Sequence, residues 1–228
     1  MKRLLLFDID GTLVQGGPAK SAFHDALVAT YSTTGPIEVH EFSGKTDPQI
    51  ARELLRLAGL EDPEIDAGLP SLFERYVVGL QSRLPATPVE VLPGVAELVD
   101  TLEREADVAL GLVTGNVAEG ARLKLTGPGL HDHFEIGGFG SDSEERNDLP
   151  GIALERARER WRVDFAPEDV VVIGDTPRDV ECGRAHGLRT VGVATGNFSA
   201  EELRDADAHV VVADFSDTSA TRDLLLAG

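Results

Sequence analysis

Short apolar runs recur along this chain with helical segments between them, and this alternation limits its possible folds more than any other feature. A short, almost wholly apolar run is typical of a strand that is buried on both faces of a parallel sheet. We predict strands over residues Arg3–Phe7, Val108–Val113, Phe134–Phe139, Val170–Ile173, Thr190–Val193 and His209–Val212. Helices are predicted over residues Gly94–Glu105, Val117–Leu125, Leu149–Trp161, Arg178–His186 and Ala200–Asp205. Strands that alternate with helices predict an α/β protein with a doubly wound parallel sheet.

The region from about residue 16 to residue 88 breaks this alternation. It contains no convincing strand, and its periodicity predicts helices over residues Ala19–Tyr31, Pro48–Ala58 and Pro63–Leu84. Glycine and proline are concentrated at its two borders, as is typical of hinges and linkers. We therefore predict an α-helical cap domain at residues 16–88, inserted into a core domain made of residues 1–15 and 89–228.

The charge of the chain excludes some classes of partner. The formal net charge is −19, so nucleic acid and anionic membranes would be repelled over most of the surface. We find no apolar stretch near the roughly 18 residues that span a bilayer and no secretory signal, which predicts a cytoplasmic protein. Only four of the 21 basic residues are lysines, a composition that resembles proteins from high-salt cytoplasm. The oligomeric state is left open between monomer and homodimer.

The sharpest motif is Asp8-Ile9-Asp10-Gly11-Thr12, which follows the first predicted strand directly. In an open parallel sheet, the carboxyl ends of the strands face the ligand crevice. Two carboxylates at such a strand end are costly unless a cation lies beside them, and Mg²⁺ prefers oxygen ligands of this kind. The alternative is that Asp8 and Asp10 only cap a turn.

Two further strand ends carry polar residues. Asp175 and Asp179 follow the strand predicted at Val170–Ile173, and if that strand neighbours the first one, their carboxylates reach the same cation. Thr114, Gly115 and Asn116 follow the strand at Val108–Val113, and a hydroxyl and backbone N–H groups at a helix start are suited to holding phosphate oxygens.

These motifs, in this order, resemble the signature motifs of the haloacid dehalogenase-like superfamily, with a Rossmann-like core and a helical cap between the first and second motifs. The resemblance implies that Asp8 attacks phosphorus and forms an aspartyl-phosphate, while Asp10 acts first as acid and then as base. It implies a Mg²⁺ ion held by Asp8, the backbone carbonyl of Asp10 and Asp175, with Asp179 as an auxiliary ligand. Thr114 would hydrogen-bond a phosphate oxygen.

Two basic residues are assigned with the help of the same resemblance. The family lysine of the third motif is missing, and Arg146 stands in its place, where we expect it to pair with Asp8 and the phosphate. A fork of guanidinium donors is workable there but not equivalent to an ammonium group. The alternative is a solvated charged loop. Lys45, in a loop that resembles the cap loop of phosphoglycolate phosphatase-like members, is expected to meet the leaving group, the alternative being a surface lysine.

The function predicted from these residues is a magnesium-dependent phosphatase that acts on a small phosphorylated metabolite, either phosphoglycolate-like or a sugar phosphate. Haloacid dehalogenases and phosphonatases of this superfamily lack a carboxylate at the position that corresponds to Asp10, so the resemblance does not extend to these two activities. A phosphomutase of the β-phosphoglucomutase type and a silent binding protein on the same fold remain as alternatives. The sequence does not show which of Lys45, Asp47, His24 and Arg75 point toward the substrate. The histidines are expected to be surface or structural residues.

Overall fold

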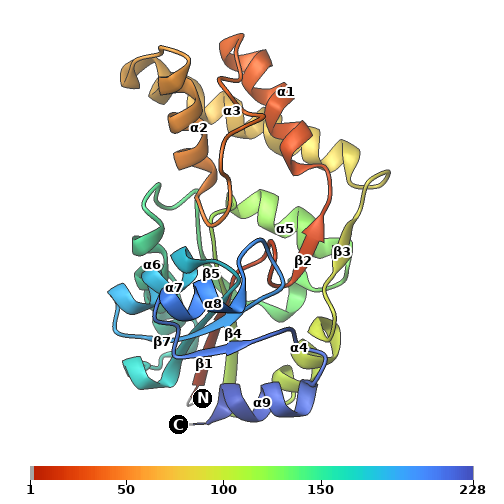
Figure 1. The fold of residues 1–228 in the computed structure, drawn as a ribbon, viewed down its shortest axis with the longest axis vertical. Coiled ribbons are helices and arrows are strands. Elements are labelled where there is room, and N and C mark those ends of the chain that lie inside the picture. The colour runs from red at the N-terminus through yellow and green to blue at the C-terminus, as the bar shows by residue number, and fades with distance from the viewer. Residues whose placement is uncertain (1–2, 228) are drawn as a thin grey trace.

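A parallel sheet lies at the centre of the molecule, and its six strands follow the order β5-β4-β1-β6-β7-β8 (Figure 1). The computed structural model describes residues 3–227. The strands of this sheet are β1 (Arg3–Phe7), β4 (Val108–Thr114), β5 (Ile136–Phe139), β6 (Val170–Gly174), β7 (Arg189–Val193) and β8 (Val210–Val212). The chain therefore adds strands outward from β1 on one side and then returns to add β6, β7 and β8 on the other. This is the doubly wound arrangement that the alternation predicted.

Helices cover both faces of the sheet because alternate residues of each strand are buried on opposite sides. Leu5 and Phe7 pack with α4, α5 and α9, whereas Leu4 and Leu6 pack with α6 and α7. The helices of this layered core are α4 (Val95–Glu103), α5 (Ala118–Thr126), α6 (Leu149–Trp161), α7 (Pro177–Ala185), α8 (Ala200–Asp205) and α9 (Thr218–Leu226). Single 3-10 turns are η1 (His131–His133), η2 (Arg146–Asp148) and η3 (Pro167–Asp169).

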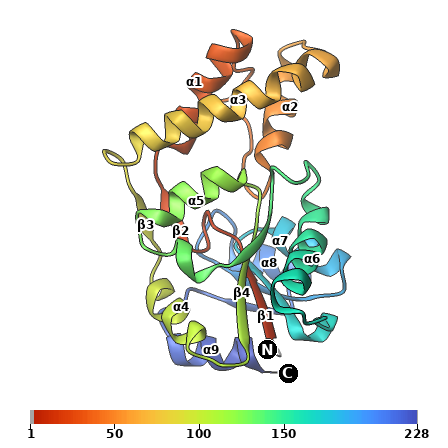
Figure 2. The same cartoon turned by 180° about the vertical axis from the view of Figure 1, so that it is seen from behind.

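Three further helices lie beyond one end of the sheet, and the two views in Figures 1 and 2 agree on this placement. They are α1 (Ala19–Tyr31), α2 (Asp47–Leu57) and α3 (Asp62–Arg83). Their apolar side chains form a hydrophobic cluster built around Phe23, Leu54 and Tyr76, which also includes Val117 at the start of α5. We call α1 to α3 with their connecting loops the helical layer. Whether residues 16–88 behave as a separate cap domain stays a prediction.

The helical layer is joined to the core by a small antiparallel ribbon. Strand β2 (Val14–Gly16) pairs with β3 (Val89–Val91), so the chain leaves the core and returns to it at the same place. Neither strand was predicted, nor was helix α9. The other predicted helices and strands are present, with ends that differ by no more than two residues.

Candidate active site

The first two acidic motifs meet where the strand order reverses. Strand β1 pairs with β6, with Phe7 opposite Ile173, and the backbone N–H of Asp8 donates to the carbonyl of Ile173 at 2.9 Å. In doubly wound sheets, ligands bind outside the carboxyl ends of the strands at this switch point. The chain places Asp8 and Asp175 there, one after each strand.

Three carboxylates gather at this point. One oxygen each from Asp8, Asp175 and Asp179 lies within 4.8 Å of the other two, and all three residues are buried. Burial raises the pKa of Asp8 and of Asp175, because a charged carboxylate is poorly solvated there and its acidic neighbours repel it. The cluster is therefore costly in its ionised form unless a cation shares it.

The donor set fits a hard divalent cation such as Mg²⁺, which binds carboxylate and carbonyl oxygens. Two glycines lie against the Asp175 carboxylate, and neither position has room for a side chain. A Cβ atom on Gly11 would lie 2.3 Å from Asp175 Oδ2, and one on Gly196 would lie 1.7 Å from it. Asp179 is differently placed. Its Oδ2 accepts hydrogen bonds from the backbone N–H and the hydroxyl of Thr176, at 3.0 and 2.7 Å.

Arg146 lies within the acidic cluster instead of in solvent. Its side chain is 6% exposed, and its Nη2 lies 3.2 Å from Asp8 Oδ1 and also contacts Asp179 Oδ1. Arg146 itself is therefore not solvated, although its neighbours Glu145, Asn147 and Asp148 are exposed. The buried Nε of Arg146 has no hydrogen-bond partner in the part of the chain that the structure describes. A guanidinium group beside the nucleophile candidate Asp8 is suited to an anionic oxygen such as that of a phosphate.

The Asp10 side chain lies in a separate hydrogen-bonded group on the other side of the site. Lys124, on α5, donates to both carboxylate oxygens of Asp10 at 2.8 and 2.7 Å and to Asn116 Oδ1 at 2.7 Å. The Asn116 amide donates in turn to Asp10 Oδ2 and to Thr114 Oγ1, both at 2.8 Å. These four residues form what we call the Asp10 network.

Lys124 is a site residue that none of the sequence motifs includes. It is 3% exposed although lysine is seldom buried. Its position, three residues after Ala121 and beside Leu125, places it on the apolar stripe of α5, which packs into the core. A lysine on an apolar helical stripe in a chain with only four lysines was the available signal.

A loop of the helical layer closes the site from above. Asp47 begins α2 and docks on the segment after β4: its N–H donates to the carbonyl of Gly115, and its Oδ2 accepts from the N–H of Val117, both at 2.8 Å. Burial raises the pKa of Asp47 to about 6, although Lys124 opposes this rise. Gly115 has no room for a side chain, since a Cβ atom would lie 2.1 Å from the carbonyl oxygen of Lys45.

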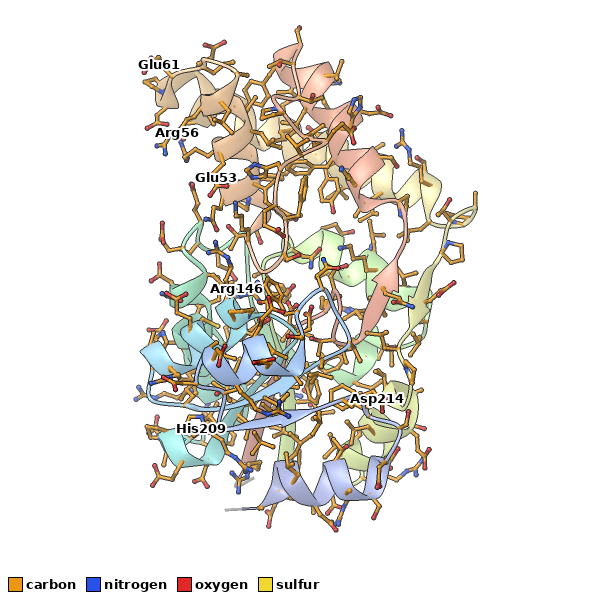
Figure 3. All side chains as sticks on the ribbon, viewed as in Figure 1. Glu53, Arg56, Glu61, Arg146, His209 and Asp214 are labelled. Carbon is orange, nitrogen blue, oxygen red and sulfur yellow. The ribbon has the colours of Figure 1, made fainter. Side chains whose placement is uncertain are left out.

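Lys45 and His40 face the site from the same layer. Both side chains are only 10% exposed, and both contact Glu53 Oε2, at 2.5 Å from Lys45 and 3.0 Å from His40. Figure 3 shows Glu53 on α2, with Arg146 below it at the top of the core. Lys45 is therefore not a surface lysine, whereas the contact of His40 with Glu53 is compatible with the structural role expected for the histidines.

One cavity of about 670 Å³ brings these residues together. The predicted site residues that line it are Asp8, Asp10, Lys45, Thr114, Gly115, Asn116, Arg146 and Asp175. Asp179 lies behind Arg146 and is not part of the lining. Of the open candidates in the helical layer, Asp47 lines the cavity, whereas His24 and Arg75 do not.

Comparisons with known proteins agree with this geometry. A model of the haloacid dehalogenase-like hydrolase family matches residues 2–187. The chain belongs to the haloacid dehalogenase-like hydrolases. Among its relatives, the phosphoglycolate phosphatase of Synechococcus elongatus is 31% identical over 193 residues, covering 84% of each chain. That of Rhodobacter capsulatus is 31% identical over 193 residues, covering 82% of each.

A solved structure supports the fold of this haloacid dehalogenase-like hydrolase. The crystal structure of a hydrolase from Pseudomonas syringae aligns over 100% of both chains with a TM-score of 0.74 and 23% identity. The family and these relatives identify a phosphoric monoester hydrolase. Over residues 3–227, every helix is too short or too polar to cross a lipid bilayer.

Proposed function

We propose that this hydrolase is a magnesium-dependent phosphatase that cleaves a small phosphate monoester, phosphoglycolate-like or a sugar phosphate, through an aspartyl-phosphate on Asp8. The observation that carries the proposal is the position of the Asp8 carboxylate on the floor of the cavity. It lies near Asp175, which follows the neighbouring strand β6, and near Arg146, whose Nη2 is 3.2 Å from Asp8 Oδ1. The relatives named above, which are phosphoglycolate phosphatases, support the same class of substrate.

The Asp8 carboxylate is the nucleophile of this scheme. One of its oxygens forms a bond to phosphorus while the bond from phosphorus to the leaving oxygen breaks. Arg146 and the Thr114 hydroxyl hold the phosphate oxygens, because both residues line the cavity and carry N–H or O–H donors. Asp8, Asp175 and the backbone carbonyl of Asp10 would hold Mg²⁺, which when bound offsets the negative charge between nucleophile and phosphate.

Asp10 is the group that moves protons. It gives its proton to the leaving oxygen in the first half of the reaction and takes one from the attacking water in the second. Its side chain is 45% exposed and lines the cavity, so it reaches both partners. Asp179 accepts from Thr176 and contacts Arg146, so we assign it the role of holding Arg146 beside the metal ligands.

The helical layer acts as a cap over the site in this proposal. Lys45 and His40 present a basic surface held in place by Glu53, while Phe23 and Tyr76 supply apolar walls. A leaving group that is small and polar or anionic suits this lining. Closure of the cap excludes water during transfer of the phosphoryl group to Asp8.

The test is phosphate release from phosphoglycolate, sugar phosphates and p-nitrophenyl phosphate, with Mg²⁺ or with a chelator. The wild type is expected to release phosphate only with Mg²⁺, and Asp8→Asn is expected to release none. Asp205→Asn, on the exposed surface of α8, is the matched control and is expected to behave as the wild type. Conversion of β-glucose 1-phosphate to glucose 6-phosphate without phosphate release would favour a mutase. Binding of phosphate esters without turnover would favour a silent binder.

A further inference from the structure

Lys124 is a buried cation whose polar contacts are all with the site. Its ammonium group has three N–H donors, and the structure uses all three, on Asp10 Oδ1, Asp10 Oδ2 and Asn116 Oδ1 at 2.8, 2.7 and 2.7 Å. A cation with every donor occupied is fixed in position. Its partner carboxylate is fixed with it.

The Asp10 carboxylate has no comparable restraint from its own segment. It belongs to the loop after β1, where the chain turns at Gly11. Of the roughly four lone-pair sites on a carboxylate, three accept hydrogen bonds from Lys124 and Asn116. One site is left for a further partner. Since Asn116 also donates to Thr114, the network ties Asp10 to the residue at the end of β4.

The use of lysine in this chain points in the same direction. Within residues 3–227, every lysine lines the cavity, namely Lys20, Lys45 and Lys124, and of these Lys20 is half-exposed whereas Lys124 is buried. Arg122, on the exposed side of α5, pairs with Glu119 in the ordinary way. Burying a lysine on α5 is unfavourable unless its charge is used, and an apolar side chain would pack the stripe at lower cost.

We propose that Lys124 is a positioning residue that holds the Asp10 carboxylate where it exchanges a proton with the leaving oxygen and with water. The inference rests on the proposed function. In the first step, the proton of Asp10 moves to the leaving oxygen as the P–O bond breaks and the bond from Asp8 to phosphorus forms. In the second, Asp10 takes a proton from water as the water oxygen bonds phosphorus and the bond to Asp8 breaks.

A comparison of leaving groups tests this role. A simple alkyl phosphate needs a proton on its leaving oxygen, whereas p-nitrophenyl phosphate does not, because p-nitrophenolate is a stable anion. In Lys124→Met, kcat/KM for the alkyl ester is expected to fall about 100-fold, which is within the range that general acid catalysis supplies. For p-nitrophenyl phosphate we expect a fall of less than about fivefold, because this ester bypasses the proton transfer. Arg122→Met, a matched loss of a cation on α5, is expected to change neither.

A double-mutant cycle separates action through Asp10 from direct contact with the substrate. If Lys124 acts through Asp10, adding Lys124→Met to Asp10→Asn changes kcat/KM for the alkyl ester by less than about threefold, because the two changes are not additive. An equal loss on both esters, or a full loss in the Asp10→Asn background, would overturn the inference. Where Lys124→Met does not fold, Lys124→Gln keeps a polar head without the charge and is expected to show the same preference. A wild type inactive on both esters would overturn the proposed function itself.

Discussion

Two buried cations organise the residues of the site, each with its own acids. Arg146 contacts Asp8 and Asp179, while Lys124 contacts Asp10. Their roles are therefore separable by mutation. Removing one partner of a buried ion pair is costly because the other is left as an uncompensated charge.

The first prediction concerns Arg146. Arg146→Met leaves Asp8 and Asp179 without their cation and is expected to lower the free energy of unfolding by about 3–5 kcal/mol in urea denaturation. Arg146→Lys keeps the charge but not the fork of donors, so we expect a smaller loss of stability. The control is Arg158→Met, because the ion pair of Arg158 with Asp164 is exposed and worth about 0–1 kcal/mol. Equal losses for Arg146→Met and the control would contradict this account.

The second prediction concerns Asp47, whose pKa burial raises from 3.8 to about 6. A carboxyl group with a raised folded-state pKa contributes stability that is present below pH 4 and is lost as pH rises through 6. Asp47→Asn keeps an oxygen that accepts from the Val117 N–H, but its amide does not ionise, so the stability lost at higher pH in the wild type is retained. Relative to the wild type, the variant is expected to gain on the order of 1–3 kcal/mol between pH 4 and pH 7.5.

Thermal unfolding of both proteins across this pH range measures the difference between them. A difference in free energy of unfolding that stays constant with pH would show that Asp47 titrates normally in the folded protein. Asp205→Asn, at an exposed position, serves again as the control and is expected to give no pH-dependent difference.

The sequence identifies residues of the site better than it identifies their partners. Asp8, Asp10, Thr114 and Asp175 follow apolar strands, so the edge of the sheet to which they belong is predictable from the chain itself. Lys124 comes ten residues after β4 ends, on the apolar stripe of α5, and such a stripe predicts core packing and not a place in the site. Its contact with Asp10 depends on how α5 packs against β1, which no local pattern specifies.

At the scale of elements, the long periodic segments were predictable and the short ones were not. Helices α1, α6 and α8 have the predicted bounds, since their apolar spacing extends over several residues. Strands β2 and β3 have three residues each, which is too few to show alternation. Helix α9 was missed although Asp217 caps it, with its side chain accepting from the N–H of Ala220 at 3.0 Å.

The third prediction tests the docking of α2 on the core. In Gly115→Ala, the new methyl group pushes against the carbonyl of Lys45, displacing the loop that carries Lys45 and Asp47. Since a misplacement of about 1 Å costs up to about 100-fold in rate, kcat/KM for phosphate esters is expected to fall by about 10- to 100-fold. The measurement is steady-state kinetics on the substrate selected by the ester panel.

Gly127→Ala is the control for this change. Gly127 has an ordinary helical backbone, with φ −59° and ψ −46°, and no atom lies within 4 Å of the position of its Cβ. The variant is expected to keep wild-type kinetics. Wild-type kinetics in Gly115→Ala as well would show that contact between the loop and β4 is not needed for turnover.

At the scale of the whole molecule, acidic residues outnumber basic ones by 40 to 21. With a net charge of −19, the acidic side chains repel one another, and salt screens this repulsion. We therefore predict that the melting temperature rises between low salt and molar KCl. Sucrose at matched osmolality is the control for preferential exclusion. A melting temperature that stays unchanged in KCl would rule out the high-salt adaptation suggested by the composition.

The cavity itself is a property of the whole molecule, because its walls come from the loops after β1, β4, β6 and β7, from Lys124 and Arg146, and from the helical layer. Sequence motifs predicted its floor, where the strand ends converge. Its roof depends on how α1 to α3 pack and on the docking of Asp47, so the sequence alone does not show which side chains face the leaving group.

The most direct test of the central claim is mass spectrometry of the enzyme after rapid mixing with substrate and acid quench. The Asp10→Asn variant is mixed with p-nitrophenyl phosphate, because this ester forms the intermediate without a proton from Asp10, whereas the loss of Asp10 slows the attack of water on the intermediate. The account predicts the added mass of one phosphoryl group on the peptide that contains Asp8, and none on that peptide in an Asp8→Asn variant. Phosphate release by the wild type, with no phosphoryl group on Asp8 or with one on another residue, would contradict it.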